Sequence, residues 1–466
     1  MGLKVLQISC NYFPESVGGT EVYVRNLSKE LLLQGNQVFI SYVSGFSQNN
    51  GPLIKKKEYS FEGVPVFVIQ KNNFKLKTKD LYFNTDRYPE IYTTFKEYLK
   101  RVHPDVVHFH HFSPTDVIIQ MQAVKDMGLP IILTYHTPMM TCSHSDMLYL
   151  GKKPCDGKID YKRCLICMQT KYRVPLCFAW VWANLPKSIT NLSGRSVSNN
   201  MYGRFATWLQ LPWFTGERIK RWEEGFKMID HFVAVCQWVY DLLIENDIPQ
   251  KKTTLCRQGI GQIPAVTKRE KGSALRLGYL GRIHPVKGID MLLKAFRLLP
   301  RHYQIGLYIY GLPGGNNSDR KYYNNLVRQT RREKRIKWLG ILEEKDKFQI
   351  LGQLDVLIIP SIWLETGPLV LLESWAVHTP VLGARIGGIA ELVEEGKGGL
   401  LFKPGDPSDL LRIIKNIYKE PDILERLRMS IPEVPTMKEV TKDMEDLYKW
   451  LINKSNGVTP TSPGFK

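Results

Sequence analysis

Short apolar runs, each followed by a loop and then by a helical pattern, recur through both halves of the chain. Residues 3–9 form the first run, and residues 20–34 form the first helical pattern, which ends at Gly35. Residues 275–281 begin the same alternation in the second half. Strands that alternate with helices build doubly wound, mostly parallel sheets. We therefore predict an α/β fold of two doubly wound, Rossmann-like domains that face a cleft.

The most informative loop precedes a helical pattern that begins near Leu369. Pro368 suits the first turn of that helix, where its missing N–H costs nothing, and Gly367 lets a ligand approach the backbone. The free N–H groups of a helix start favour an anion. Glu365 lies in the same loop, and Glu373 lies about two turns along the helix. The two carboxylates can hold hydroxyls on either side of a diphosphate, as a nucleotide-sugar requires.

Two glycine-bearing motifs flank this stretch in the sequence. Residues 281–288 read GRIHPVKG and place Arg282 and Lys287 after a predicted strand, where two cations suit a diphosphate. Residues 387–391 read GGIAE. With the Glu-x7-Glu spacing between them, these motifs make the chain resemble the retaining glycosyltransferases of family four, a GT-B type of group 1 glycosyltransferase.

The resemblance implies an activity and a role for each of these residues. A sugar would move from a nucleotide diphosphate sugar to an acceptor hydroxyl, with retention at the anomeric carbon. Arg282 and Lys287 would neutralise the leaving nucleoside diphosphate. Glu365 would hold the sugar at the catalytic centre, Glu373 would hold the ribose, and Leu342 would lie near the base.

The resemblance also bears on metal use and on the direction of attack. The N–H groups of Gly367 and Leu369 would face the sugar or the phosphate. The chain has no Asp-x-Asp sequence to hold a cation on the diphosphate, so no catalytic metal is expected. By resemblance, the acceptor hydroxyl attacks from the leaving-group side with a phosphate oxygen as base.

The first half carries a glycine pair and histidines that follow predicted strands. Gly18 and Gly19 lie between the first strand and the first helix, and the resemblance implies that they face the donor diphosphate from the opposite domain. Histidines occupy the carboxyl ends of two strands, where α/β sheets place ligands. By resemblance, His110 or His136 lines the sugar pocket as a candidate catalytic residue. The sequence does not rank the two, and a purely structural role is the alternative.

Four cysteines fall within a polar segment rich in glycine and lysine: Cys142, Cys155, Cys164 and Cys167. A closing Cys-x-x-Cys in a reduced compartment predicts a structural zinc site that would order an irregular segment. His144 is a possible substitute ligand. Four unrelated thiols are the alternative, and redox catalysis is less favoured because no thioredoxin-like βαβ pattern surrounds the pair.

Residues 171–228 combine aromatic and basic side chains. The tryptophans are Trp180, Trp182, Trp208, Trp213 and Trp222. The cations among them are Lys171, Arg173, Lys187, Arg195, Arg204, Arg218, Lys220 and Arg221. This composition is typical of a segment that lies in a membrane interface or contacts a lipid-linked acceptor. A packed helical subdomain and a nucleic-acid site are the alternatives.

These patterns predict the domain boundaries. An acceptor-side domain spans residues 1–258 and contains the Cys-rich and Trp/basic insertion at about 140–228. The nucleotide-sugar domain spans 259–436. By resemblance, a helix over 437–456 crosses back to the first domain, and a disordered tail follows it. Residues 45–60 are polar and are predicted as a loop.

Composition narrows the partners. The formal charge of +19, from 64 Lys and Arg against 45 Asp and Glu, favours phosphate-bearing ligands or anionic lipid. No signal sequence or membrane-spanning run is recognised, which predicts a cytoplasmic protein, peripheral at the membrane face if the aromatic segment binds there. The predicted partners are a nucleotide-sugar and a glycan or lipid-linked acceptor, without nucleic acid. An epimerase or hydrolase on the same fold, or a basic zinc-containing nucleic-acid-binding protein, are the rival functions.

Overall fold

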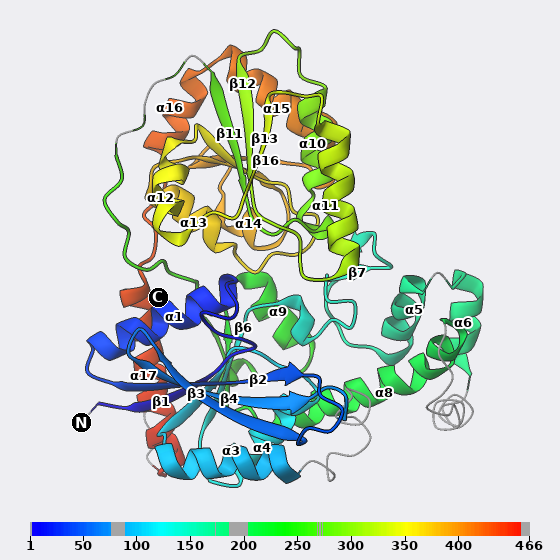
Figure 1. Ribbon diagram of the computed structural model, residues 1–466, viewed down its shortest axis with the longest axis vertical. Helices are drawn as coiled ribbons and strands as arrows, with labels where there is room; N and C mark the ends of the chain where they lie inside the picture. Colours follow the sequence, from blue (N-terminus) through cyan, green and yellow to red (C-terminus); the bar gives the residue numbers. More distant parts are fainter. Residues whose placement is uncertain are drawn as a thin grey trace. The chain divides into compact units, whose positions relative to one another are not determined.

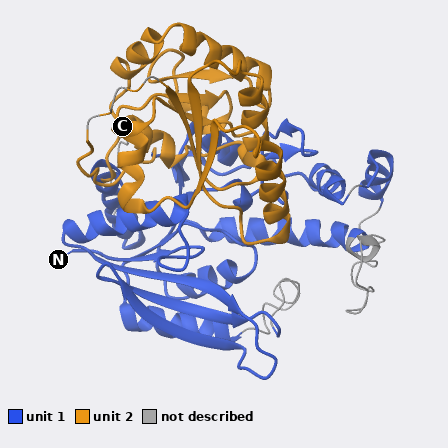
Figure 2. Cartoon of the chain, turned by 45° about the horizontal axis from the view of Figure 1, so that its top comes forward, with its two compact units in different colours: residues 1–256, 438–466 blue, residues 257–437 orange. Residues whose placement is uncertain are grey.

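The computed structural model describes residues 2–75, 89–172, 174–185, 204–267, 269, 272 and 274–457. The chain divides into two compact units: residues 1–256 with 438–466, and residues 257–437 (Figure 2). Each unit is an α/β domain with its own sheet (Figure 1). The predicted disordered tail lies, from residue 458 onward, outside the described residues.

The first unit is built on an eight-stranded sheet in the order β10-β9-β6-β5-β1-β2-β4-β3. Its pairs are parallel except β3 with β4. In chain order the strands are β1 (Lys4–Ile8), β2 (Gln37–Phe46), β3 (Ile54–Phe61), β4 (Val64–Asn72), β5 (Val106–Phe109), β6 (Ile131–Tyr135), β9 (His231–Ala234) and β10 (Thr253–Leu255). The helices around it are α1 (Gly19–Leu33), α3 (Pro89–Val102), α4 (Asp116–Lys125), α9 (Gln237–Glu245) and α17 (Met437–Ser455), with single 3-10 turns at η2 (Pro138–Met140) and η3 (Gln250–Lys252).

Strand β3 corrects the prediction that residues 45–60 form a loop. It is an edge strand whose centre, Lys55 to Glu58, is exposed on both faces. Lysines on an edge strand block pairing with other chains, and they also remove the apolar alternation by which a strand is recognised. The sequence signal was therefore absent although the strand pairs with β4 along its whole length.

A cysteine-bearing loop and three helices extend the first unit between β6 and β9. The loop contains a small hairpin, β7 (Leu148–Tyr149) with β8 (Lys153–Pro154), and the helices are α5 (Tyr161–Lys171), α6 (Leu176–Asn184) and α8 (Arg204–Met228). Figure 1 shows α5 and α6 beside the N-terminal end of α8, away from the eight-stranded sheet. No described helix is both long and apolar enough to cross a membrane.

The second unit is built on a six-stranded parallel sheet in the order β13-β12-β11-β14-β15-β16. In chain order its strands are β11 (Leu275–Leu280), β12 (Ile305–Tyr310), β13 (Ile336–Gly340), β14 (Val356–Ile359), β15 (Val381–Ala384) and β16 (Gly399–Phe402). Its helices are the 3-10 turn η4 (Pro285–Lys287), α10 (Ile289–Arg297), α11 (Asn317–Thr330), α12 (Glu344–Gln353), α13 (Leu369–Ala376), α14 (Gly387–Leu392), α15 (Pro407–Lys419) and α16 (Asp422–Met429).

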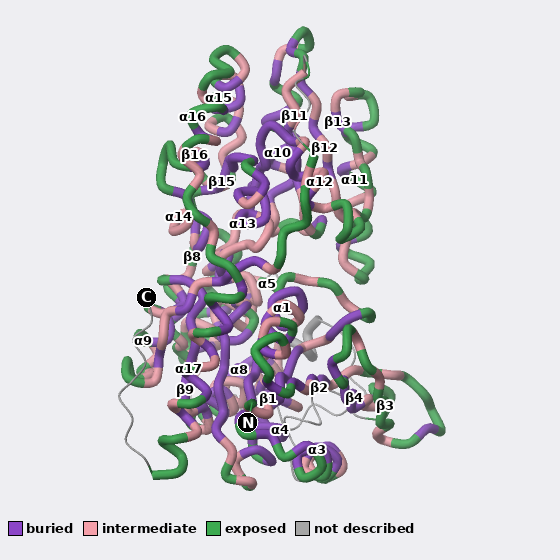
Figure 3. Tube along the Cα trace, turned by 90° about the vertical axis from the view of Figure 1, so that its left-hand side faces the viewer, coloured by how far each residue is buried: buried purple, intermediate pink, exposed green. Residues whose placement is uncertain are grey.

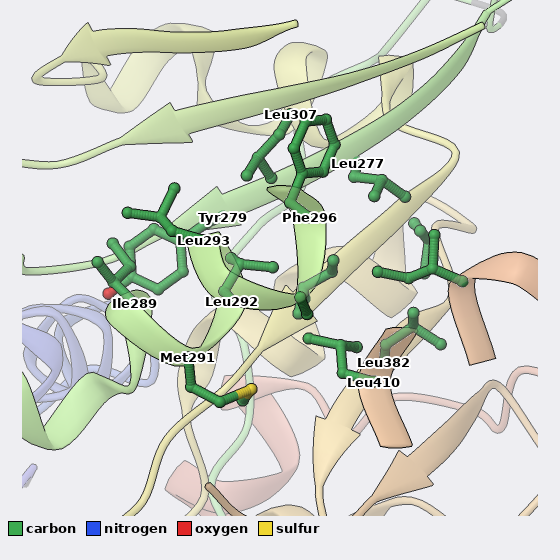
Figure 4. Close-up of a cluster of buried hydrophobic side chains, with 14 of the residues drawn as sticks. Leu277, Tyr279, Ile289, Met291, Leu292, Leu293, Phe296, Leu307, Leu382 and Leu410 are labelled. Carbon is green, nitrogen blue, oxygen red and sulfur yellow. The ribbon is translucent and has the colours of Figure 1, made fainter. Parts of the chain in front are cut away.

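Apolar side chains on α10 fill one face of this second sheet. Phe296 of α10 lies beside Leu277 of β11 and Leu307 of β12 (Figure 4), and Leu292 and Leu293 of α10 belong to the same buried cluster. The spacing of three and four residues between these two leucines and Phe296 is the helical period that the sequence showed over 289–299. In Figure 3 the strands of both sheets are mostly buried, whereas many connecting loops are exposed. In each unit the buried strands therefore fix the positions of the loops that follow their carboxyl ends.

Candidate functional site

The second unit has its topological switch point between β11 and β14. From β11 the chain runs outward to β12 and β13, returns to β14 beside β11, and continues in the other direction to β15 and β16. Open α/β sheets bind ligands at such a point, beyond the carboxyl ends of the two strands. The loops that follow these strands carry the two motifs that the sequence singled out, with Lys287 after β11 and Glu365 after β14.

Backbone contacts tie these two loops together. The N–H of Ile362 donates to the carbonyl of Val286 at 2.9 Å. Gly288 has a φ of +68°, and a Cβ atom there would lie 1.9 Å from the carbonyl oxygen of Pro360. Only glycine combines the left-handed conformation with this close approach. The relative position of the two loops is thus set by main chain rather than by flexible side chains.

Glu365 is a buried carboxylate with a cationic partner. Its Oε1 lies 2.7 Å from Nζ of Lys287 and accepts a hydrogen bond of 2.6 Å from the hydroxyl of Ser361. Burial alone would raise the pKa of Glu365, but the charge of Lys287 and these hydrogen bonds outweigh it, so the pKa is lowered. The side chain is therefore ionised at neutral pH and can accept hydrogen bonds from ligand hydroxyls.

The GGIAE motif supports the Glu365 loop through its backbone. The N–H of Gly388 donates to the carbonyl of Glu365 at 2.7 Å. A Cβ atom on Gly388 would lie 2.5 Å from the backbone nitrogen of Gly367. The glycine pair at the start of α14 therefore lets that helix approach the loop closely and hold it in place.

Glu373, the second predicted carboxylate, lies on α13 and is also buried. Its Oε1 lies 2.6 Å from Nζ of Lys347 on α12. Lys347 could not be identified from the sequence, because the pattern of a charged helix does not indicate which of its faces meets α13. The two carboxylates thus resemble each other: each is buried, and each is paired with one lysine.

The sequence suggested that Pro368 lies in the first turn of α13, but the helix begins after it. Pro368 is the residue that precedes the helix, with an extended ψ of 122°, and Leu369 is the first helical residue. Pro368 therefore lies at the N-cap rather than in the first turn, and its side chain makes no capping hydrogen bond. The N–H groups at the start of α13 follow directly on Gly367, which has a φ of +105°.

Arg282 and Leu342 lie in loops that leave the same sheet. Arg282 follows β11 with its side chain exposed, and its carbonyl accepts a hydrogen bond of 2.9 Å from the hydroxyl of Tyr279. Leu342 is half-buried and follows β13, the edge strand two positions from β11. The structure therefore brings Lys287 and Glu365 into contact, whereas Leu342 projects from a separate loop.

In the first unit a chain of hydrogen bonds fixes the protonation of His110. The hydroxyl of Ser28 donates to the carbonyl of Val24 at 2.7 Å, so it accepts from Nε2 of Gln7 at 3.1 Å. This orients the amide so that Oε1 of Gln7 faces Nε2 of His110 at 2.7 Å. Because an amide oxygen only accepts, Nε2 of His110 carries the proton.

The chain continues to His136. Nδ1 of His110 lies 3.0 Å from Nε2 of His136, and a neutral His110 with its proton on Nε2 can only accept there. Burial lowers the pKa of His110 well below its ordinary value and lowers that of His136 to about 3. Both rings are therefore neutral at physiological pH, and His136 donates through Nε2. The structure brings together the two histidines between which the sequence could not choose.

A third buried histidine connects the sheet to the terminal helix. Nδ1 of His108 lies 2.7 Å from the hydroxyl of Tyr448 on α17, and its Nε2 lies 2.7 Å from the hydroxyl of Thr134. Burial lowers the pKa of His108 well below its ordinary value. With both ring nitrogens used inside the protein, His108 has a structural role.

Gly18 and Gly19 lie at the start of α1 with a carboxylate of the chain beside them. Gly18 is the N-cap residue and Gly19 begins the helix. A Cβ atom on Gly18 would lie 2.6 Å from Oε2 of Glu21, whose other oxygen accepts a hydrogen bond of 3.4 Å from Ser16. Burial raises the pKa of Glu21. Glu21 could not be identified from the sequence. Its carboxylate lies at the start of α1, where an anionic ligand was expected to bind.

The predicted zinc site is not supported. Cys142, Cys155, Cys164 and Cys167 line one cavity together with His144. Among the described residues, however, no group of three or more His, Cys, Asp or Glu side chains is arranged to hold a metal ion. Sγ of Cys167 accepts the N–H of Leu150 at 3.2 Å, and burial raises the pKa of this thiol to about 11. The spacing of the cysteines in the sequence is therefore not matched by a metal-binding arrangement among the described residues.

Both units match known protein families. Residues 266–433 match Glycosyl transferases group 1, and residues 17–158 match Glycosyltransferase Family 4. The chain belongs to the group 1 glycosyltransferases. Among curated relatives of this group 1 glycosyltransferase is the D-inositol 3-phosphate glycosyltransferase of Corynebacterium efficiens, 34% identical over 30% of the chain and 35% of the relative. The enzyme of the same name from Corynebacterium urealyticum is 29% identical over 52% of the chain and 54% of the relative.

These matches span between about a third and a half of the length of those relatives. Solved structures resemble this chain over almost its whole length. A sucrose-phosphate synthase from Thermosynechococcus elongatus has a TM-score of 0.62 and 17% identity, with 97% of this chain and 100% of the other covered. Anabaena Alr3699/HepE in complex with UDP and glucose has a TM-score of 0.60 and 15% identity, with 96% and 99% covered. The fold is therefore GT-B, with two Rossmann-like domains.

Proposed function

We propose that the protein transfers a sugar from a nucleotide diphosphate sugar to a hydroxyl of a glycan or lipid-linked acceptor. The observation that carries this proposal is the buried Lys287–Glu365 pair at the switch point, beside the uncapped start of α13. A sugar with hydroxyls to bind and a diphosphate to neutralise needs an ionised carboxylate next to cations and free N–H groups. The family supports the same reaction class.

Each residue has a proposed role in this reaction. Glu365 accepts hydrogen bonds from donor sugar hydroxyls, and Glu373 holds the ribose. Arg282 and Lys287 neutralise the charge that develops on the leaving diphosphate, which is the largest electrostatic requirement of the transfer. Because these cations and a helix start supply the positive charge, transfer proceeds without a divalent cation. The acceptor oxygen attacks from the face that the diphosphate leaves, so the anomeric configuration is retained.

The first unit supplies the acceptor side. Neutral His136 donates its Nε2 proton to His110, so its Nδ1 can only accept a hydrogen bond, which suits a contact from a ligand hydroxyl. Gly18 and Gly19 allow close approach to the donor diphosphate. The relatives named D-inositol 3-phosphate glycosyltransferase and glycogen synthase act on different acceptors, so their names leave the acceptor class open. The cytoplasmic location also stays a prediction.

A donor screen tests the proposal. Nucleotide diphosphate sugars are incubated with the protein in the presence of EDTA, and release of the nucleoside diphosphate is measured. We expect one donor to bind and to be hydrolysed slowly, and Glu365→Gln to lose this turnover by about 100-fold or more. Glu343→Gln, a change at an exposed carboxylate, is the matched control and should leave the rate unchanged.

Three results would contradict the proposal: no donor binds, a divalent cation is required, or Glu365→Gln retains the wild-type rate. NMR of the transferred sugar reports its anomeric configuration, and inversion would contradict the mechanism. Product analysis also separates transfer from the rival epimerase or hydrolase activity. A donor converted equally well with and without acceptor would favour those alternatives.

A further inference from the structure

Helix α6 exposes an unusually apolar surface. Its nine residues, LCFAWVWAN, include no charged side chain. Ala179 and Ala183 are buried, whereas Leu176, Phe178, Trp180 and Val181 are exposed to 53%, 64%, 61% and 53%. Four large exposed apolar side chains on one short helix form a contiguous patch, and such patches on a protein surface usually mark an interaction site.

The helix is held in place from its opposite side. Nε2 of Gln169 on α5 donates to the carbonyl of Ala179 at 3.2 Å. Trp182 stacks on Trp208 of α8 with ring centroids 4.8 Å apart. Figures 1 and 2 both show this end of the first unit extending from its sheet, so the patch lies away from the site residues of that unit.

Positive charge borders the patch. Nζ of Lys162 donates to Oδ1 of Asn184, the last residue of α6, at 2.8 Å. Lys171 is the last residue of α5, and α6 begins five positions later at Leu176. Both lysines are exposed. From residue 161 to residue 216 the sequence contains no Asp or Glu but seven Lys and Arg, although the whole chain has 45 acidic residues. Such a long acid-free stretch indicates a surface that meets negative charge.

We propose that α6 is an interfacial helix by which the protein binds the surface of an anionic lipid bilayer. Exposed tryptophan, phenylalanine and leucine side chains with lysines at the border are the composition of helices that lie at the level of lipid headgroups. Nine helical residues are too short to cross a bilayer, so the helix lies in the interface. Anionic lipid adds an attraction for each bordering cation.

The arrangement of the patch favours lipid over nucleic acid. A single strand of nucleic acid needs cations along its phosphates and aromatic rings for its bases. Here the patch also contains the exposed aliphatic side chains Leu176 and Val181, and Lys162 lies at the Asn184 end of the helix. The proposal does not depend on the proposed transfer reaction, and vesicle binding is measured without a sugar donor.

Flotation of the full chain with vesicles tests the proposal. Vesicles of phosphatidylcholine are compared with vesicles that also contain phosphatidylglycerol. We expect binding to the anionic vesicles only, with a loss of affinity of about tenfold or more in the double variant Phe178→Ser/Trp180→Ser. The matched control is Leu33→Ser/Leu298→Ser, which removes two equally exposed apolar side chains elsewhere and should bind as the wild type.

The charge contribution has its own pair of variants. Lys162→Gln/Lys171→Gln should weaken binding to anionic vesicles by about tenfold. Lys29→Gln/Lys100→Gln changes the net charge equally at two exposed positions outside α5, α6 and α8 and should have a small effect. A fall of equal size in both variants would show a non-specific attraction by the basic chain and would overturn the assignment to α6.

Cys177 provides a site-specific readout, because it lies on α6 and is the exposed one among the eight cysteines. Anionic vesicles should protect Cys177 from a water-soluble maleimide, as measured by mass spectrometry of its peptide. The proposal is overturned if wild-type protein stays with the unbound fraction, if Cys177 reacts equally with and without vesicles, or if a single-stranded RNA protects it and vesicles do not.

Discussion

Replacing Lys287 by methionine tests whether the pair with Glu365 holds the candidate site together. The variant keeps most of the side-chain volume but removes the charge that lies 2.7 Å from the buried carboxylate. Glu365 would then remain ionised at neutral pH with the Ser361 hydroxyl as a neutral partner. A buried charge without its counter-ion is strongly destabilising.

The structure sets the expected magnitude. Breaking a buried ion pair from one side costs about 3–5 kcal/mol. The side chain of Lys287 is 23% exposed and that of Glu365 is 8% exposed, so the low end, about 3 kcal/mol, applies. Lys345→Met is the matched control, since its pair with Glu343 is 74% and 67% exposed and water screens it almost completely.

Hydrogen exchange of the full chain measures this effect locally. Peptides from β14 to α13 should exchange about 100-fold faster in Lys287→Met at neutral pH, because each 1.4 kcal/mol is roughly tenfold. The same peptides should be unchanged in Lys345→Met. Equal exchange in Lys287→Met and wild type would refute the reasoning.

The pH dependence supplies a second test with a definite sign. In the folded wild type the pKa of Glu365 is lowered below its value in the unfolded chain, which is about 4.3. The ionised Glu365 therefore stabilises the fold at a pH above about 4.3, and this stabilisation is lost as the pH falls through the pKa of the folded state. In Lys287→Met only hydrogen bonds to neutral groups such as Ser361 oppose the effect of burial, so the pKa of Glu365 should rise above its value in the unfolded chain. The variant then regains stability as it is acidified toward about pH 4, and the difference from wild type should shrink there. A difference that stays constant with pH would contradict this account.

Two further predictions concern the loops and the histidines. Gly288→Ala should lower the free energy of unfolding by more than about 1 kcal/mol, because residue 288 has a left-handed conformation and its Cβ would meet the carbonyl oxygen of Pro360. Gly315→Ala is the control and should change the melting temperature little, because the space around residue 315 is open. An unchanged melting temperature in both would show that the loop relaxes. Because the pKa of His136 is about 3, nitrogen NMR of the protein should show it neutral with its proton on Nε2 from about pH 5.5 to 8, and Gln7→Leu should mix the two tautomers. An imidazolium signal in that range would contradict the assigned hydrogen-bond chain.

Some features could not be read from the sequence because they depend on contacts between distant segments. Strand β3 was missed because an exposed, lysine-rich edge strand lacks apolar alternation and is defined by its pairing with β4. The zinc prediction is not supported among the described residues, because spacing along the chain does not show where folded thiols point. Glu21 beside the glycine pair gave no signal, since an acidic residue in the first turn of a helix is common.

By itself the sequence determined the α/β fold and the identity of the carboxylates, glycines and cations at the candidate site. Those signals are local: an apolar run, a glycine that permits a close turn, and a helix that follows. Only the tertiary structure decided which lysine meets which glutamate. Lys287 and Glu365 are 78 residues apart, and Lys347 and Glu373 are 26 apart. The first pair forms because the sheet places β14 beside β11, and strand order is a property of the packed domain that no local pattern contains.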